Sequence, residues 1–299
     1  ENIRGEELPR AAAIEKSLMN MLTIKDSLAL YRDFYEKMGI AGLFAMPAPR
    51  TLEWADVYPF LYLRAAFEGL KQSGVTKHLV IDEMQDYSYL QYVILQNLFS
   101  CRMTILGDRA QTLDEKPHDV LAFLPRIFGK GIRKIVMDKS YRNTVEIADY
   151  AARISGIEGT ELLNRHGKPV EEQTFSKEEE MLDAICENLN LGENEEDSAN
   201  AARSSEGYET AAVLTMTEGE AIAIYRLLKT RGIEASYVDR DSSLFKKGLT
   251  VTTFYLAKGL EFDQVFEIQG DKENPLLGQA AYICATRALH ELYVYCLEG

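Results

Sequence analysis

Short apolar runs alternate with stretches of helical periodicity along most of the chain. Beyond residue 74, the apolar runs predict strands at 79–81, 103–106, 135–137, 170–175, 211–215, 236–238, 249–254, 264–268 and 292–297. Between these runs, apolar residues recur three and four positions apart, as in the helices predicted over 217–231 and 277–289. Because strands alternate with helices, the chain is expected to belong to the α/β class, with parallel sheets.

The region before residue 74 has a different pattern. Apolar residues at helical spacing predict one helical stretch over residues 1 to about 47 and a second helix from about 55 to 72. Gly39 and Gly42 mark the end of the first stretch. Nothing in this region carries chemistry by itself, so we expect it to be a helical support.

Local sequence also predicts how several later segments begin. Ser88 can cap the helix that follows it, whereas Ser176 with Glu179, and Thr217 with Glu220, have the spacing of a capping box. Residues 190–207 combine acidic residues with Asn, Ser, Ala and Gly, a composition that predicts a mobile loop.

The run Leu79-Val80-Ile81 ends in two carboxylates, Asp82 and Glu83. A second strand is predicted at 103–106. The residues between the two strands are enough for one right-handed crossover helix, so we expect the strands to form a buried parallel pair. Ligands of open α/β sheets bind at the carboxyl ends of such strands. Asp82 would hold a hydrated Mg²⁺ there, and Glu83 would accept a proton from an attacking water. The alternative is an ordinary strand end with two solvated acids.

Composition narrows the classes of function. The 299 residues include 33 Lys and Arg against 47 Asp and Glu, so the net charge is −14. A protein that only binds nucleic acid usually has a basic surface, so this balance leaves room for a protein partner. The four cysteines form no C-x-x-C pair, which disfavours zinc and disulfides. Without a secretory signal or an apolar run of about 18 residues, we expect a cytoplasmic protein that contacts no membrane.

Five segments that carry polar chemistry occur in a fixed order. They are Asp82-Glu83-Met84-Gln85-Asp86, Gly107-Asp108-Arg109-Ala110-Gln111, Ser140-Tyr141-Arg142-Asn143-Thr144, the stretch 253–262, and Ala285-Thr286-Arg287-Ala288. Together they resemble the motifs of superfamily 1 helicases of the UvrD/Rep type, over about residues 79 to 295. The sequences of Asp86-Tyr87-Ser88 and of residues 255–263 are more similar to those of the HelD-like branch. This branch contains helicase-like ATPases that act on bacterial RNA polymerase.

The resemblance implies a fold and a set of roles. It implies two RecA-like lobes of the P-loop NTPase type, the first incomplete and preceded by helices, over residues 1–125 and 126–299. Gln111 would sense the γ-phosphate and the attacking water, Tyr141 would stack on adenine, and Glu261 would accept a hydrogen bond from the ribose. The full set is catalytic Glu83, Gln111, Arg142 and Arg287; cofactor-binding Asp82, Tyr141, Gly259 and Glu261; and nucleic-acid candidates Thr253, Tyr255 and Lys258.

One expected motif does not occur in these residues. No G-x-x-x-x-G-K-[ST] segment is present to hold the phosphates of ATP. The chain also lacks an initiator Met, so we expect it to be the C-terminal portion of a longer protein, holding half of a site for ATP and Mg²⁺. By itself it is expected to be inactive.

Three functions remain open at this point. The first is the motor portion of an ATP-dependent helicase-like protein that remodels nucleic-acid complexes, with single-stranded DNA and RNA polymerase as expected partners. The second is a 3′-to-5′ DNA helicase of repair or replication. Against processive unwinding, Tyr255 stands where DNA helicases usually have His, and Thr112-Leu113-Asp114 replaces a base-stacking aromatic residue. The third is an interaction module that does not hydrolyse ATP.

Overall fold

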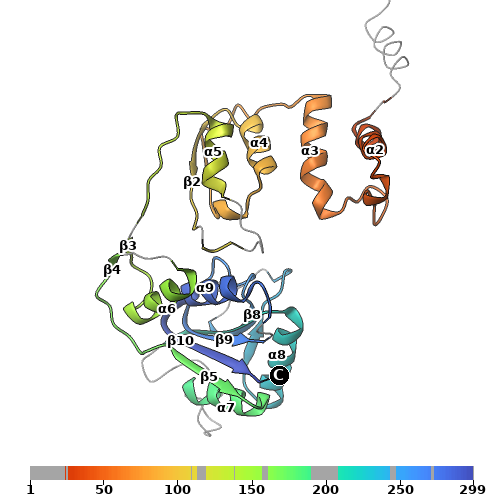
Figure 1. The fold of residues 1–299 in the computed structure, drawn as a ribbon. Coiled ribbons are helices and arrows are strands. Elements are labelled where there is room, and N and C mark those ends of the chain that lie inside the picture. Colours follow the sequence, from red (N-terminus) through yellow and green to blue (C-terminus); the bar gives the residue numbers. More distant parts are fainter. Residues whose placement is uncertain are drawn as a thin grey trace, which may run out of the picture. The chain divides into compact units, whose positions relative to one another are not determined.

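The computed structural model describes residues 24, 26–108, 110–112, 119–137, 139–156, 161–189, 208–242, 247–270 and 273–298 (Figure 1). These residues form two compact units. Unit 1 contains the described residues up to Gly107 together with Asp119–Ile132, and unit 2 contains those of Asp108–His118 and of Arg133–Gly299. Both units combine helices with parallel strands, so the α/β class predicted from the sequence is confirmed.

Unit 1 contains a two-stranded sheet with helices around it. Its elements are α2 (Ser27–Lys37), α3 (Trp54–Glu68), β1 (His78–Ile81), α4 (Tyr89–Leu98), β2 (Arg102–Ile105) and α5 (Val120–Phe128), with 3-10 turns at Ala41–Leu43 and Met84–Asp86. The strands β1 and β2 pair in parallel, and Ile81 is opposite Ile105. Ile81 packs on Tyr92 of α4 and Leu124 of α5, so these two helices cover the face of the sheet that bears Ile81.

Several predictions for unit 1 need correction. The first predicted helix lies partly outside the described residues, and its described part ends at Lys37. The helix predicted to end near 72 ends at Glu68, because Gly69 takes a φ of 83° that leaves the helical region. The strand at 79–81 is parallel, but it is not buried throughout, since Val80 is 61% exposed. Its side chain alternates to the face opposite Ile81.

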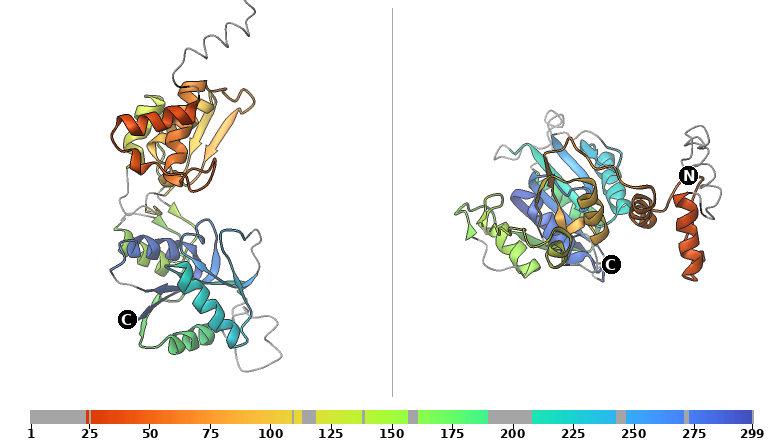
Figure 2. Two further views of the ribbon diagram at one scale, coloured as in Figure 1. Left: turned by 90° about the vertical axis from the view of Figure 1, so that its right-hand side faces the viewer. Right: turned by 90° about the horizontal axis from the view of Figure 1, so that it is seen from above.

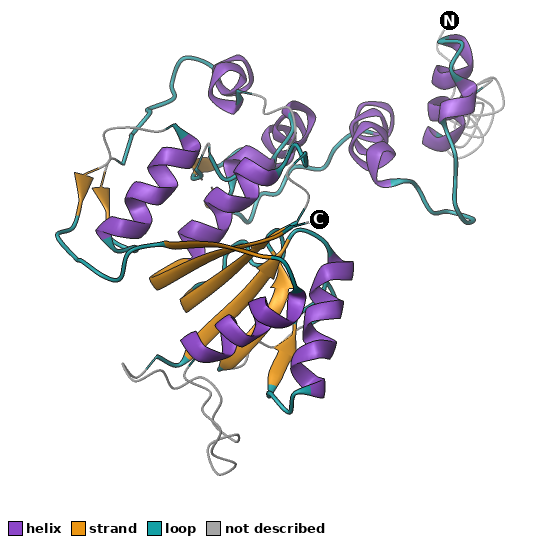
Figure 3. Ribbon diagram, turned by 60° about the horizontal axis from the view of Figure 1, so that its bottom comes forward, coloured by secondary structure: helices purple, strands orange, loops and turns teal. Residues whose placement is uncertain are grey.

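Unit 2 is built on a six-stranded parallel sheet with the strand order β5-β10-β9-β6-β8-β7 (Figure 3). Its strands are β5 (Glu171–Phe175), β6 (Thr210–Thr215), β7 (Ala235–Tyr237), β8 (Gly248–Thr253), β9 (Phe262–Gln269) and β10 (Ala288–Leu297). Its helices are α6 (Val145–Ser155), α7 (Glu178–Asn188), α8 (Glu218–Thr230) and α9 (Leu277–Arg287), and β3 (Lys139–Ser140) pairs separately with β4 (Glu161–Leu162).

Helices cover both faces of this sheet, as the views in Figure 2 also show. On one face, α6 and α9 pack on strand residues such as Leu214 and Val265. On the other face, α7 and α8 pack on Val213 and Phe266. Because neighbouring strand residues point to opposite faces, β6 and β9 are buried on both sides. The packed core on both faces therefore holds the carboxyl ends of these strands in fixed positions.

Some predictions for unit 2 are confirmed and others are wrong. The Thr217–Glu220 capping box forms at the start of α8, as does a box of Ser88 with Gln91 at α4 in unit 1. The predicted box at Ser176 does not form: Lys177 is the N-cap of α7, and the Ser176 hydroxyl donates to Glu298 Oε2 over 3.1 Å. The acidic loop 190–207 lies outside the described residues.

Two further boundaries differ from the sequence pattern. The apolar run at 135–137 is not a strand, and its side chains are exposed, Met137 by 85%. A strand needs a partner for its backbone groups, and the pairing starts two residues later, in β3. In α9, the helix ends at Arg287 rather than near 289, because β10 begins at the next residue. No helix among the described residues combines the length and apolar character needed to cross a membrane.

Candidate functional site

In unit 1, the two predicted carboxylates lie in a constrained turn directly after β1. Glu83 has φ 54° and ψ 49°, a left-handed conformation that costs free energy in a residue with a side chain. The Asp82 Oδ1 atom accepts the backbone N–H of Glu83 over 2.8 Å. The Glu83 Oε2 atom accepts a hydrogen bond from Gln85 Nε2 over 2.6 Å. The turn therefore fixes the direction in which both carboxylates leave the strand.

The end of β2 and helix α4 hold this turn in place. The Met84 N–H donates to the Leu106 carbonyl over 2.8 Å, and the Tyr92 hydroxyl donates to the Met84 carbonyl over 3.0 Å. A Cβ added to Gly107 would lie 2.6 Å from Met84 N, so only glycine permits this close approach. The cost of the left-handed Glu83 is thus offset by contacts to the neighbouring strand and helix.

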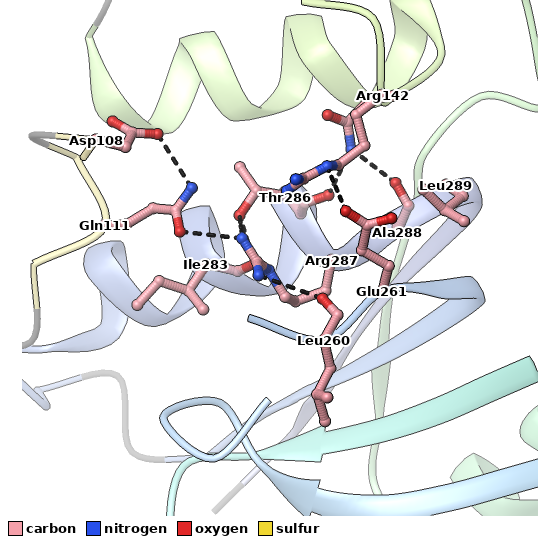
Figure 4. Close-up of polar contacts among 12 residues, drawn as sticks. Asp108, Gln111, Arg142, Leu260, Glu261, Ile283, Thr286, Arg287, Ala288 and Leu289 are labelled. Atoms are coloured by element: carbon pink, nitrogen blue, oxygen red, sulfur yellow. Dashed lines mark hydrogen bonds and ion pairs between the residues drawn. The ribbon is translucent and has the colours of Figure 1, made fainter. Parts of the chain in front are cut away.

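In unit 2, Gln111 is held on three sides (Figure 4). Its Nε2 atom donates to Asp108 Oδ2 over 3.1 Å, and its Oε1 atom accepts Arg287 Nη2 over 3.0 Å. Its backbone carbonyl accepts Lys258 Nζ over 2.7 Å. The Tyr282 hydroxyl donates to the same Asp108 oxygen over 2.9 Å; burial, with Asp108 nearby, raises the pKa of this tyrosine. The amide of Gln111 is therefore oriented by a carboxylate and a guanidinium.

Arg287 is the last residue of α9 and is only 3% exposed. Besides Gln111, its guanidinium donates to the Leu260 carbonyl and to the Thr286 hydroxyl, each over 3.2 Å. A buried cation is costly unless hydrogen bonds replace its water. These acceptors replace the water that burial removes from the guanidinium, and a guanidinium of this kind can stabilise an anion.

Arg142 and Glu261 form an ion pair beside this network. The Nε atom of Arg142 is 2.8 Å from Glu261 Oε1, and both side chains are 44% exposed. Arg142 lies between β3 and α6, whereas Glu261 immediately follows Leu260, whose carbonyl Arg287 contacts. Four predicted site residues, Gln111, Arg142, Glu261 and Arg287, are thus gathered in one part of unit 2 (Figure 4).

The remaining predicted residues have different environments. Tyr141, beside Arg142, is exposed, which leaves its ring accessible. Gly259 has a φ of 85°, a left-handed conformation that favours glycine. Among the nucleic-acid candidates, Thr253 is buried at the end of β8, Tyr255 donates to Glu218 over 3.0 Å, and Lys258 holds the Gln111 carbonyl. The predicted roles of all these residues stay predictions.

Asp82 and Glu83 belong to unit 1, whereas Arg142 and Arg287 belong to unit 2. The side chains are suited to Mg²⁺ and a nucleotide: Asp82 offers an exposed carboxylate after a parallel strand, and unit 2 offers two guanidinium groups. Asp82 would hold the ion through water, and Mg²⁺ would neutralise charge on phosphate oxygens.

Sequence reasoning did not identify three residues that hold this arrangement together. Tyr282 contacts Asp108, Asn143 contacts the end of α9, and Arg165 contacts two backbone carbonyls. Asn143 stands inside a recognised motif, which is a signal that could have identified it. Arg165 stands outside every motif, and no local pattern marks it.

Comparisons with known proteins give weak similarities. Neither a protein-family model nor a curated protein matches the sequence. One similar solved structure is the C-terminal domain of a possible DNA helicase from Lactobacillus plantarum WCFS1, at 27% identity and a TM-score of 0.40, covering 53% of this chain and 88% of that one.

Two viral structures are also similar. The arterivirus nonstructural protein 10 helicase has 15% identity and a TM-score of 0.39, over 76% of this chain and 40% of that one. The PRRSV helicase has 16% identity and a TM-score of 0.40, over 96% of this chain and 50% of that one. The chain thus spans half or less of the length of these viral helicases. TM-scores this low do not transfer a function.

Proposed function

We propose that this chain is the motor portion of an ATP-dependent, superfamily 1 helicase-like protein that translocates on nucleic acid or remodels its complexes. One observation carries the proposal. Gln111, Arg142, Glu261 and Arg287, which come from four separate motifs, lie together in unit 2. Packing alone does not require two guanidinium groups, an oriented amide and a carboxylate at one place.

The proposed chemistry assigns one task to each side chain. Glu83 accepts a proton from the attacking water, and Gln111 orients that water against the γ-phosphate. Arg142 and Arg287 stabilise the charge that develops on the phosphate oxygens, and Glu261 accepts a hydrogen bond from the ribose. The products are ADP and phosphate, and the proton leaves through Glu83. The two units would be the two RecA-like lobes.

The finer proposal is that the nucleic-acid complex contains RNA polymerase and that the protein acts in the cytoplasm on single-stranded DNA. It rests on the similarity of the sequences of residues 86–88 and 255–263 to those of the HelD-like branch. The net charge of −14 supports it, since such a surface does not favour nucleic acid as the only partner. A phosphate-binding loop from outside these 299 residues would complete the site.

The test measures ATP hydrolysis and nucleotide affinity in the complete natural protein. Glu83→Gln removes the general base and should lower turnover by about 10²- to 10⁴-fold while ATP still binds. Arg287→Ala should also lower turnover, through lost charge stabilisation in the transition state. The matched controls, Glu234→Gln and Arg226→Ala, change exposed residues of unit 2 and should hydrolyse ATP at the parent rate.

Release of RNA polymerase from nucleic acid is measured with the same variants. If Glu83→Gln and Arg287→Ala release the polymerase as fast as the parent does, ATP chemistry is irrelevant to the activity. The chain would then be an interaction module. If hydrolysis is lost but the parent protein unwinds DNA and leaves RNA polymerase bound, the DNA-helicase reading replaces the polymerase proposal.

A further inference from the structure

We infer that Asn143 and Arg165 are positioning residues that hold the backbones carrying Arg142 and Arg287 at a fixed spacing, so that both guanidinium groups reach one anionic ligand together. The inference rests on the proposed function, because it concerns the same two arginines. Neither Asn143 nor Arg165 would contact the nucleotide. We call these two side chains and the four carbonyl groups that they bind the backbone clamp.

The first half of the backbone clamp is Asn143, the residue after Arg142. Its Nδ2 atom donates to the Ala288 carbonyl over 2.7 Å and to the Ala285 carbonyl over 3.2 Å. Both carbonyls flank Arg287 at the end of α9, where the last turn of a helix leaves carbonyl groups without intrahelical partners. Asn143 therefore ties the Arg142 segment to the end of the helix that carries Arg287.

The second half is Arg165, in the loop after β4. Its Nη2 atom donates to the Arg142 carbonyl over 2.5 Å and also to the Leu289 carbonyl. Its Nε atom is buried and has no hydrogen-bond partner among the described residues. Because one guanidinium donates to both backbone carbonyls, it fixes the distance between the two backbone segments. Arg165 thus bridges the same two segments that Asn143 joins.

The loop that carries Arg165 is itself fastened to the start of α6. The Arg165 carbonyl accepts Val145 N–H over 2.9 Å, and Glu146 accepts Gly167 N–H over 2.8 Å. His166 Nδ1 lies 2.8 Å from the other Glu146 oxygen. Hydrogen bonds from His166 and from the Gly167 backbone lower the pKa of Glu146 to about 2, so the carboxylate stays charged.

Close packing at Gly167 also holds the loop that carries Arg165 in place. A Cβ on Gly167 would lie 2.7 Å from Thr144 Cγ2 and 3.2 Å from the His290 carbonyl oxygen. Thr144 is the N-cap of α6, and His290 belongs to β10. The base of Arg165 is therefore fixed against both segments that its guanidinium joins, which makes the clamp stiff.

Fixed spacing matters because each arginine contributes only when it reaches the same charged oxygen at the same time. Displacement of a catalytic group by about 1 Å can lower a rate by about 10²-fold. Helices α6 and α9 also pack together through apolar side chains, and the backbone clamp adds directional hydrogen bonds at the ends that carry the two arginines. The clamp therefore couples two arginines that are far apart in sequence.

The experiment uses four variants in the complete natural protein. Asn143→Asp keeps the shape but replaces a donor by a carboxylate oxygen that faces two carbonyls, and Arg165→Met keeps an unbranched side chain but removes the donors. The matched controls are Asn188→Asp, whose amide contacts Ala184 and Tyr295, and Arg153→Met, whose guanidinium pairs with exposed Glu172. We expect kcat to fall by about 10- to 100-fold in the two clamp variants only. Their affinity for nucleotide should change by less than about 3-fold.

Two further measurements separate positioning from a merely structural role. Arg165→Lys should recover most of the lost kcat, because both contacts of Arg165 come from one nitrogen, which a lysine also offers. In a background of Arg142→Ala, adding Arg165→Met should cost little more, since only one guanidinium is left and no spacing between two remains to be fixed. A loss of kcat that multiplies fully in the double variant would overturn the inference, as would parent kcat in both clamp variants.

This outcome is distinct from failure of the proposed function. If Glu83→Gln keeps the parent ATPase rate, the proposed function fails, whatever the clamp variants do. If Glu83→Gln loses activity and the clamp variants keep it, only the inference fails. If a clamp variant does not fold, its melting temperature falls together with nucleotide binding, and Arg165→Lys becomes the deciding variant. If Arg165→Lys folds but loses kcat, and that loss multiplies fully with the loss of Arg142→Ala, positioning is contradicted.

Discussion

The two units of this chain share one kind of architecture but differ in the size of their sheets and in how far helices cover them. Unit 2 has six parallel strands with helices on both faces, and its central side chains, such as Phe266 and Val213, are fully buried. Unit 1 has two strands, and helices α4 and α5 cover the face that bears Ile81. Val80, on the alternate face, remains largely exposed.

This difference shows what each half of the candidate site depends on. In unit 2, the group of Gln111, Arg142, Glu261 and Arg287 lies beside a large core. Its polar contacts orient these side chains, while the core stabilises the sheet. The carboxylate turn of unit 1 depends on a few local contacts, namely those of Met84, Tyr92 and Gly107. Substitutions should therefore have different consequences in the two units, even where the residue type is the same.

The largest expected effect is the loss of an aromatic ring from the core of unit 2. Phe266 is fully buried and stacks on Tyr293, with ring centroids 4.8 Å apart. Phe266→Ala should lower the free energy of unfolding of unit 2 by about 3–5 kcal/mol, because it leaves a cavity. The measurement is unfolding in denaturant, monitored by amide hydrogen exchange, which reports the stability of each unit separately.

The matched variant in unit 1 is Phe123→Ala, which removes a partly buried ring beside Tyr92. Its effect should be smaller and confined to the amides of unit 1. If Phe266→Ala instead reduced protection equally throughout both units, they would unfold as one cooperative body. The comparison between a unit with a large core and a unit with a small core would then be wrong.

A smaller effect is expected at the carboxylate turn. Gly107→Ala would place a methyl group 2.6 Å from the Met84 backbone nitrogen, which cannot move aside as a flexible side chain can. We expect unit 1 to lose about 1–3 kcal/mol of stability, as in other overpacked sites. The control is Gly74→Ala in the same unit, where the added methyl group meets nothing within 4 Å. Equal melting temperatures for the two variants would contradict the proposed packing of the turn.

Local patterns in the sequence predicted most elements of the fold. The predicted cap at Ser88 and the predicted capping box at Thr217 both form, because their partners lie three residues away. The box at Ser176 does not form: Lys177 is the N-cap of the helix, and the Ser176 hydroxyl donates to a distant residue, Glu298. The apolar run at 135–137 looks like a strand, but strands exist only where another strand pairs with them. Errors thus arise where a distant partner decides the local structure.

The same reasoning explains what could be predicted of the candidate site. Motif order identified Gln111, Arg142, Glu261 and Arg287 as a set, and their gathering in unit 2 is what the structure adds. The hydrogen bond between Gln111 and Arg287 joins residues 176 positions apart, and no local pattern specifies such a pair. Arg165 is less predictable still, because it acts on backbone carbonyls, which every residue has.

The most direct test of the central claim is a structure of the complete natural protein with Mg²⁺ and a non-hydrolysable ATP analogue. The claim is that the Gln111, Arg142, Glu261 and Arg287 group faces the nucleotide. We expect the guanidinium groups of Arg142 and Arg287 within about 3 Å of γ-phosphate oxygens, as charge-assisted hydrogen bonds require. Glu261 should then contact the ribose rather than Arg142. A nucleotide bound elsewhere, with the Arg142–Glu261 pair and the Arg287–Gln111 contact unchanged, would contradict the claim.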